Sequence, residues 1–250
     1  MVTTSVAPPV AGSSTRSQYG LSPAPRPRAA AFVARYPETN FGCVYNEGAL
    51  FLNATHRGEE GLYCLSMPVD DDMAMIGGRE QFGFPKKMAE ITLEQEDSRR
   101  IGRVVRKGVE ILRIECVATD DVDDTDMDGF STAGQDSSGK PCRNAVSYLF
   151  KFFPSAKGDG FDYLPRLIRQ VTVFRPRPGL KKGDGDVILT SSPFDPLGEV
   201  PVKGVDVCLY GVWDNTMLSG RRVARAWNPL RFARHAFFKT DFAPLVLGEV

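Results

Sequence analysis

The sequence predicts a mainly β protein built on an antiparallel sheet or barrel. Its apolar runs are short, and Gly, Pro or Asp interrupts them at close intervals. These runs are rich in β-branched and aromatic residues, which strands favour. In residues 109–117 apolar and charged side chains mix as they do in a half-buried strand. Many short strands of this kind are typical of antiparallel sheets and barrels.

The expected elements follow from these runs. Residues 1–28 contain five prolines among small residues and are predicted to form a flexible N-terminal arm before a single domain of residues 29–250. The runs that read as strands are 31–34, 61–67, 109–117, 146–153, 167–174, 187–190 and 205–212.

Helical patterns are few. Residues 219–227 and 229–238 are the candidates, whereas Pro85 prevents a regular helix interior over 82–87. The acidic stretch 118–142 is expected as the longest loop. The glycine-containing stretch 181–186 lacks the spacing of a phosphate loop and is expected as a hairpin turn.

Composition limits the function classes. Lys plus Arg is 31 and Asp plus Glu is 31, so the net charge of zero gives no field to attract nucleic acid or an anionic membrane. We therefore expect neither as a partner, and a homo-oligomer is compatible with the small charge repulsion. No apolar run reaches the ~20 residues of a membrane span, and no apolar signal segment opens the chain.

The five cysteines include no CxxC spacing and are odd in number, which argues against a disulfide framework or a zinc site. Reduced thiols in a cytoplasmic protein are expected. Residues 1–37 lack acidic residues, as organelle transit peptides do, but they also lack an amphipathic pattern.

Two polar features are expected to be structural rather than catalytic. Residues 124–129 open like a calcium loop, but Gln135 stands where its bidentate Glu belongs, so a solvated acidic loop is expected and no metal. His56 and His235 have no Ser or Cys in a nucleophile-elbow context.

Residues 77–90, Gly-Gly-Arg-Glu-Gln-Phe-Gly-Phe-Pro-Lys-Lys-Met-Ala-Glu, point to a different chemistry. A lysine pair is most often a solvated surface patch. Here, however, Lys86 and Lys87 follow an apolar Phe-Gly-Phe-Pro segment, and burial disfavours the ammonium form of a lysine. A neutral amine can attack a ketone carbonyl and form an iminium.

At this point the sequence resembles the acetoacetate decarboxylase family. Gly78-Arg79-Glu80 and Phe84-Pro85-Lys86-Lys87 are similar to its signature, and residues 42–47, Gly-Cys-Val-Tyr-Asn-Glu, resemble its Gly-x-Tyr-x-Glu segment with one extra residue. The interval from Glu47 to Lys86 fits the family's usual separation. Looser matches lie at 148–154, 169–174, 195–197 and 201–203, and the resemblance runs from about residue 30 to about residue 240.

The resemblance implies a barrel-like antiparallel fold with peripheral helices, and an enzyme that decarboxylates a β-keto acid. It implies Lys86 as the Schiff-base lysine, Lys87 as the charged neighbour that favours its neutral form, and Glu47 as a pocket carboxylate that positions groups or moves protons. No metal, pyridoxal phosphate or nicotinamide cofactor is required, because the iminium draws the electrons itself.

The implied substrate-binding residues are four. Phe84 and Met67 fall where the family lines its pocket. Arg79 and Glu80 are expected to hold the loop more than to touch the keto acid.

Alternatives remain because the chain departs from the family. Acetone-forming members carry an N-terminal segment with a pocket Arg and a further Glu, whereas Ala29–Ala34, where that Glu would fall, is apolar. The same Schiff base could serve aldol condensation, dehydration or cyclisation of a keto acid in secondary metabolism. A catalytically silent ligand-binding protein is the alternative from another class.

Overall fold

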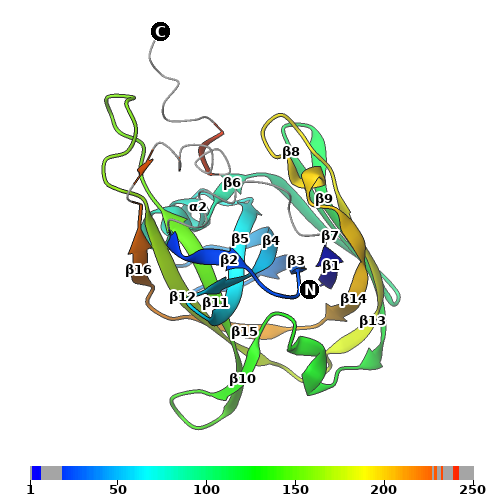
Figure 1. Cartoon of the computed structure of the whole chain (residues 1–250). Coiled ribbons are helices and arrows are strands. Elements are labelled where there is room, and N and C mark those ends of the chain that lie inside the picture. The colour runs from blue at the N-terminus through cyan, green and yellow to red at the C-terminus, as the bar shows by residue number, and fades with distance from the viewer. Residues whose placement is uncertain (1, 7–18, 227, 230–231, 233–238, 242–250) are drawn as a thin grey trace.

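Short apolar runs form β-strands along most of the chain, and the computed structural model describes residues 2–6, 19–226, 228–229, 232 and 239–241 (Figure 1). The first eight strands are β1 (Val2–Val6), β2 (Leu21–Pro23), β3 (Arg28–Tyr36), β4 (Tyr45–His56), β5 (Glu59–Val69), β6 (Lys86–Met88), β7 (Glu90–Glu96) and β8 (Arg99–Arg106). The others are β9 (Val109–Asp121), β10 (Thr132–Gln135), β11 (Pro141–Lys151), β12 (Arg166–Pro176), β13 (Lys181–Leu189), β14 (Val202–Tyr210), β15 (Trp213–Met217) and β16 (Arg221–Arg225).

The described helices are short. They are the α-helix α2 (Asp72–Gly77), the π-helix η1 (Gly78–Phe82), and the 3-10 turns η2 (Asp124–Met127) and η3 (Leu197–Glu199). In the part of the chain that is described, no helix has the length and apolar character needed to cross a membrane.

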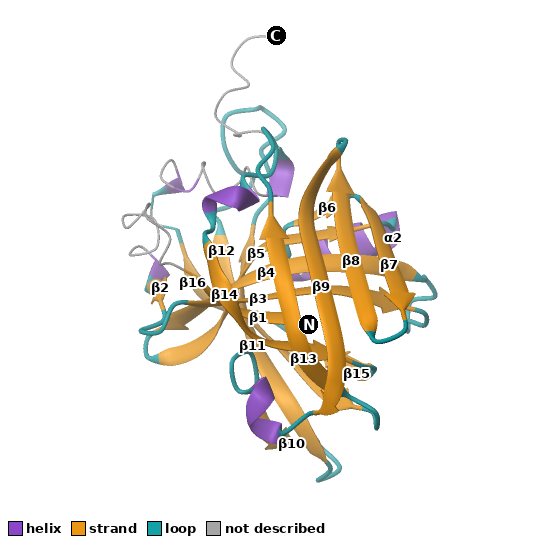
Figure 2. Cartoon of the chain, turned by 90° about the vertical axis from the view of Figure 1, so that its right-hand side faces the viewer, coloured by secondary structure: helices purple, strands orange, loops and turns teal. Residues whose placement is uncertain are grey.

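The strands join in one curved sheet of order β15-β12-β11-β5-β4-β3-β1-β14-β13-β9-β8-β7, to which β10, β16, β2 and β6 add at β11, β12, β4 and β5. Figure 2 shows β13, β9, β8 and β7 side by side. The sheet curls until β3 meets β8: a Cβ at Gly102 would lie 2.6 Å from Cβ of Val33. The expected mainly β, barrel-like fold with few helices is therefore confirmed.

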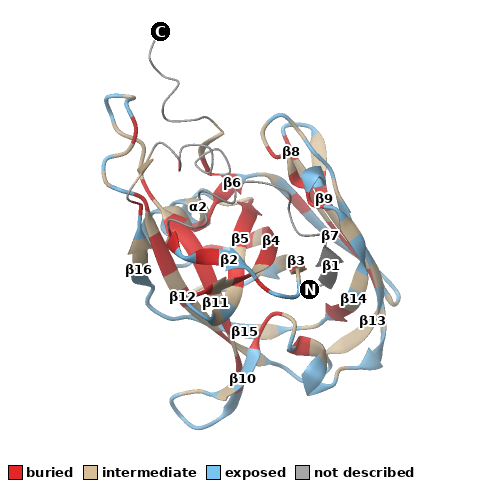
Figure 3. Ribbon diagram, viewed as in Figure 1, coloured by how far each residue is buried: buried red, intermediate tan, exposed pale blue. Residues whose placement is uncertain are grey.

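Apolar side chains pack against both faces of the strand β4. One cluster packs β3 and β4 against β8, β9 and β13, around Leu50, Val104 and Leu112. A second cluster covers β4, β5 and β11 and includes Met67 and Phe84. Figure 3 shows the buried residues concentrated on these strands. Because β4 is covered on both faces, its residues 47–52 are all buried and show no alternation.

Two expectations from local pattern are wrong. Residues 181–186 are not a turn but the first part of β13, which pairs with β9. The described part of the expected helix 219–227, residues 219–226, is not helical, because 221–225 pair as β16 with β12. In both cases sheet pairing overrides the local propensity of the segment. Most of the other expected helix, 229–238, lies outside the described residues.

Two strands lie within the segment expected to be a loose arm. Val2–Val6 pairs with β3 and β14, and Leu21–Pro23 pairs with β4. Those two stretches therefore differ from a loose arm, while the domain boundary at residue 29 stays a prediction. The expected loop 118–142 also contains the end of β9, η2 and β10.

The expectation that all thiols are reduced is wrong for one pair, because the structure joins Cys116 and Cys208 in a disulfide. Their Cα atoms are 6.0 Å apart although β13 lies between their strands. Gly185, which pairs with Cys116, makes this approach possible, since a Cβ there would lie 2.8 Å from Sγ of Cys208. Sequence spacing could not show this proximity. Cys43, Cys64 and Cys142 are free and buried.

The buried lysine Lys239 packs against the third apolar cluster, an aromatic group around Phe150, Phe152 and Phe232. Lys239 Nζ donates a hydrogen bond to the backbone oxygen of Phe152 at 3.0 Å and lies 4.6 Å from the centre of that ring. Burial lowers the pKa of Lys239 to about 7, and the cations Arg79 and Lys151 act in the same direction.

Stability should therefore depend on the protonation of Lys239. Between pH ~7 and ~10 the unfolded chain binds a proton that the folded chain has given up, so the free energy of unfolding rises with pH in this window. Lys239→Met should remove that dependence. The free energy of unfolding of the variant minus that of the parent should therefore fall by about 2–3 kcal/mol between pH 7 and pH 9.5.

Denaturant unfolding of both proteins at the two pH values measures this change. Lys157→Met, at an exposed position, is the control and should show no such change. An equal difference between the Lys239 variant and the parent at both pH values would contradict the prediction.

Candidate active site

The crossover between β5 and β6 places both candidate lysines on a short parallel strand. After β5 the chain forms α2, which Asp71 caps through its side chain, and then η1, which Gly83 follows as its C-cap. Gly83 has φ of 96°, and a Cβ there would lie 2.8 Å from Cα of Lys151. This turn directs Phe84–Lys87 back along β5, where Met67 pairs with Lys86.

Lys86 meets Glu47 inside the protein. Its Nζ donates a hydrogen bond to Oε2 of Glu47 at 2.6 Å, and both side chains are buried, with 7% and 6% exposed. Glu47 comes from β4 and pairs with Val69 on β5, so β5 brings the two residues together although 39 positions separate them. Glu47 therefore faces Lys86, while the catalytic roles expected of the two residues stay a prediction.

The walls around the amine are tight. The Nζ atom of Lys86 lies 5.2 Å from the centre of the Tyr45 ring. A Cβ at Gly78 would lie 2.6 Å from Cδ of Lys86 and 3.3 Å from its Nζ. The lysine side chain therefore runs against the backbone of η1, and glycine at position 78 leaves the room for it.

A second contact chain reaches Glu47 from the other side. Tyr36 Oη donates to Oε1 of Glu47 at 3.5 Å, and Nδ2 of Asn215 donates to Oη of Tyr36 at 3.5 Å. The rings of Tyr36 and Tyr45 stack with centres 4.7 Å apart. Burial and the charge of Glu47 hold the pKa of both phenols well above their usual range. Both therefore stay protonated and can donate.

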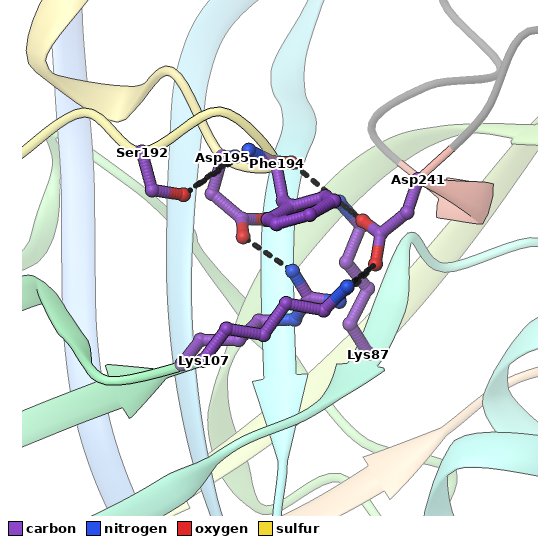
Figure 4. A network of polar contacts seen from close by, with 7 residues as sticks. Lys87, Lys107, Ser192, Phe194, Asp195 and Asp241 are labelled. Carbon is purple, nitrogen blue, oxygen red and sulfur yellow. Dashed lines mark hydrogen bonds and ion pairs between the residues drawn. The ribbon is translucent and has the colours of Figure 1, made fainter.

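Lys87 points away from Lys86, because successive side chains of a strand take opposite faces. Its Nζ donates to the backbone oxygen of Phe194 at 3.0 Å and pairs with Asp195 at 2.9 Å and Asp241 at 2.6 Å. Figure 4 shows how these side chains converge. Arg106 pairs with the same two carboxylates, at 2.5 Å for Asp195, and Lys107 lies 3.5 Å from Asp241.

The four predicted substrate-binding residues separate into two pairs. Met67 and Phe84 are buried in one apolar cluster that adjoins β6. Arg79 and Glu80 lie on η1, the first half-buried and the second exposed. Burial lowers the pKa of Arg79. Among the described residues neither side chain has a hydrogen bond or ion pair to Lys86 or Glu47. Contact of any of the four with a keto acid stays a prediction.

Several residues at this site were given no role by the sequence reasoning. Tyr45 belongs to the matched segment 42–47, and its position two residues before Glu47 on a strand places both on one face, which could have indicated its role. Tyr36 is opposite Tyr45 on β3, and Asn215 is on β15. No local signal points to Arg106 or Asp241, which reach Lys87 only through the tertiary fold.

The other polar residues that the sequence singles out are the two histidines and the acidic loop 124–129. His56 is buried near Tyr148, and burial lowers its pKa. His235 lies outside the described residues. In the acidic loop Asp126 pairs with Lys182, and Asp128 pairs with Arg143. Within the described ranges no three His, Cys, Asp or Glu side chains form a group that could hold a metal ion.

Comparison with known proteins decides the family. The family model described as acetoacetate decarboxylase (ADC) matches residues 18–226. The chain belongs to the acetoacetate decarboxylase family. An acetoacetate decarboxylase of Chromobacterium violaceum is 28% identical over 187 residues, 74% of this chain and 70% of that protein. Acetoacetate decarboxylase 2 of Mesorhizobium japonicum is 28% identical over 199 residues, 77% and 68% of the two chains.

Solved structures of acetoacetate decarboxylase type share the fold. The crystal structure of acetoacetate decarboxylase from Legionella pneumophila matches with a TM-score of 0.73 at 19% identity, covering 90% of this chain and 83% of that one. The enduracididine biosynthesis enzyme MppR, complexed with a condensation product of pyruvate and imidazole 4-carboxaldehyde, matches with a TM-score of 0.64 at 19% identity, covering 89% and 86%. One fold thus serves proteins described by different reactions.

Gly78→Ala should displace the Lys86 side chain without disturbing the fold. The φ of −64° at Gly78 suits alanine, but the added Cβ occupies the path of the lysine. We expect the rate of imine formation with a keto acid, measured by borohydride trapping at Lys86, to fall about 10²-fold, a loss typical of a misplaced reacting group.

Gly77→Ala is the matched control, because a Cβ there meets nothing within 4 Å. Its trapping rate and melting temperature should equal those of the parent. If Gly78→Ala traps the keto acid as fast as Gly77→Ala does, the packing argument fails.

Proposed function

We propose that the protein is a Schiff-base lyase that decarboxylates a β-keto acid of the acetoacetate type on Lys86. The observation that carries the proposal is the buried contact between Lys86 and Glu47 at 2.6 Å. Membership of the acetoacetate decarboxylase family supports the reaction class. A buried amine beside a buried carboxylate supplies both groups that imine chemistry needs, a nucleophile and a proton carrier.

The reaction begins at the lysine. The neutral amine of Lys86 adds to the ketone carbonyl, and loss of water gives an iminium. The bond between the carboxylate and its neighbouring carbon then breaks, and its electrons pass to the iminium nitrogen. Carbon dioxide leaves an enamine on Lys86. Protonation at carbon restores the iminium, and water releases the ketone and the free amine.

Glu47 is the group placed to move the protons. While the pair is intact, Oε2 of Glu47 holds the Lys86 ammonium, so transfer of one proton between them yields the nucleophile and a carboxylic acid. That acid can later protonate the enamine carbon. Tyr36, which stays protonated, donates to Oε1 and keeps the carboxylate oriented.

A second candidate keeps the imine and changes the outcome to condensation or dehydration of a keto acid. The observation that favours it is the apolar stretch Ala29–Ala34 on β3, of which Ala29, Ala30 and Ala31 are buried. This stretch offers no further carboxylate. MppR, whose structure contains a condensation product of pyruvate, has the same fold.

Borohydride reduction in the presence of acetoacetate should attach the acid-derived group to Lys86. We expect mass spectrometry of the digested protein to place the adduct on that residue, because borohydride reduces the imine to a stable secondary amine on the lysine that formed it. Lys86→Ala should abolish both the adduct and the release of carbon dioxide. Lys157→Ala, which changes an exposed lysine, should leave both intact.

The outcomes separate the candidates. An adduct on Lys86 together with release of carbon dioxide from acetoacetate supports the decarboxylase. An adduct with pyruvate and an aldehyde, but no carbon dioxide from acetoacetate, supports the condensing enzyme. No adduct with any of a panel of keto acids would contradict both and leave a silent binding protein.

Glu47→Gln should separate imine formation from product release. Gln keeps the shape but neither holds the ammonium by charge nor delivers a proton, so the imine should form while turnover falls about 10²–10⁴-fold, the usual contribution of a proton-transfer group. Single-turnover trapping and carbon dioxide release measure the two steps. Glu90→Gln on β7 is the exposed control. A variant with unchanged turnover would remove Glu47 from the mechanism.

A further inference from the structure

Lys239 is a buried amine that the proposed reaction does not use. The residue is 4% exposed, and its Nζ donates to the backbone oxygen of Phe152 at 3.0 Å. The same atom lies 4.6 Å from the ring centre of Phe152 and 5.4 Å from that of Phe153. Burial lowers the pKa of Lys239 to about 7, so a large share of this side chain is a neutral amine, and hence a nucleophile, near neutral pH.

A narrow cavity opens beside this amine. Besides Lys239, it is lined by Tyr63, Cys64, Gly83, Pro85, Phe150 and Phe152. Its free space is about that of one small solvent molecule, so the cavity is too narrow for a keto acid and admits only a ligand of very few atoms. Because most of its wall is apolar, an uncharged ligand enters at a lower cost than an ionised one.

The cavity adjoins the segment that carries Lys86. Gly83 and Pro85 precede Lys86 at the entry to β6. Cys64 on β5 lines the cavity and lies close enough to Glu47 and Lys86 to be affected by their charges. Burial and Glu47 raise the pKa of its thiol, while Lys86 lowers it. A small neutral product released at Lys86 therefore arises close to this cavity.

Three charged groups act on the Lys239 amine. Arg79 on η1 and Lys151 on β11 disfavour its ammonium form, whereas Glu80 on η1 favours it. Lys151 Nζ donates to the backbone oxygen of Gln81 at 3.1 Å, which holds this cation against η1. Cations that disfavour a further cation favour an anion at the same place. Burial penalises either charged form of the side chain, so the neighbouring cations decide between them.

We propose that Lys239 is a carbon dioxide site, at which its amine reversibly forms a carbamate that Arg79 and Lys151 stabilise. Carbon dioxide is linear, uncharged and triatomic, so it suits a narrow apolar cavity. The inference goes beyond the proposed function and does not require it, because dissolved carbon dioxide is a sufficient source. Decarboxylation at Lys86 is a second source of the same molecule.

The step balances without an oxidant or a reductant. The lone pair of Nζ of Lys239 forms a bond to the carbon of carbon dioxide, and one C–O π pair moves to an oxygen. The nitrogen then gives one proton to water, which leaves a carbamate, N–H–COO⁻ on the lysine, and one H⁺. The remaining N–H can still donate to the backbone oxygen of Phe152. The side chain changes from neutral to −1 beside two cations.

The experiment equilibrates the full chain with ¹³C-labelled carbon dioxide at a fixed partial pressure from pH 6 to 9. Carbamate is followed by ¹³C NMR, then ethylated with triethyloxonium ion and located by peptide mapping. We expect the Lys239 carbamate to appear as the pH passes about 7, with the neutral amine. Exposed lysines, with a usual pKa of ~10.4, should form carbamate only at higher pH. The α-amino group, with a usual pKa of ~8, is an internal comparison that mapping separates.

Substitutions of the charged neighbours give effects of opposite sign at pH 8. Arg79→Met removes a favourable charge and should lower the equilibrium constant for the Lys239 carbamate about tenfold. Arg79→Lys keeps the charge and should match the parent. Glu80→Gln removes the opposing charge and should raise the constant several-fold. Lys239→Met should lose the signal, whereas Lys157→Met, at an exposed position, should keep it.

The outcomes that overturn the proposal are specific. Absence of carbamate on Lys239, or carbamate confined to the α-amino group and exposed lysines, rejects the site. A Lys239 carbamate that ignores both Arg79→Met and Glu80→Gln rejects the role of the neighbouring charges. If Lys239→Met does not fold, peptide mapping of the parent and the comparison of Arg79→Met with Arg79→Lys still decide.

Acetoacetate labelled at its carboxyl carbon tests the two proposals separately. Label that reaches Lys239 in the parent but not in Lys86→Ala supports both. Label that reaches Lys239 from carbon dioxide but not from acetoacetate leaves the carbon dioxide site standing and contradicts the decarboxylase. Release of labelled carbon dioxide without any label on Lys239 supports the decarboxylase and rejects the carbon dioxide site.

Discussion

Two adjacent lysines are both buried in this protein, and that constraint organises the structure around them. An ammonium group removed from water needs a carboxylate or several acceptors nearby, otherwise its burial costs several kcal/mol. The strand β6 solves this by sending Lys86 and Lys87 to opposite faces. One face supplies a single carboxylate, Glu47, and the other supplies two together with an arginine.

The difference between the two faces is chemical as well as geometric. Glu47 has protonated phenols beside it and one lysine as its ion-pair partner. Asp195 pairs with two cations, and Asp241 pairs with three. The same kind of side chain therefore pairs with a single cation on one side of β6 and with several on the other. Burial alone does not distinguish the two lysines.

Sequence reasoning predicted the β-rich fold, the Lys86–Glu47 pairing and the segment that carries them. These depend on local strand patterns and on a short motif with a fixed separation. It could not predict the partners of Lys87, because Arg106 and Asp241 reach it only through the curl of the sheet and the path of the C-terminal segment. It misjudged 181–186, 219–227 and the Cys116–Cys208 pair for the same reason: pairing between distant strands decided them.

The short strand β6 is attached to the sheet through β5 alone. The segment 72–85 that precedes it crosses over the end of the sheet as α2, η1 and a glycine turn, so its length and side chains can change without shifting the register of any sheet strand. Substitutions away from Gly78 can thus change the wall near Lys86 while β6 keeps its pairing with β5. Such a separation of anchor and wall lets the surroundings of the lysine change without rebuilding the scaffold.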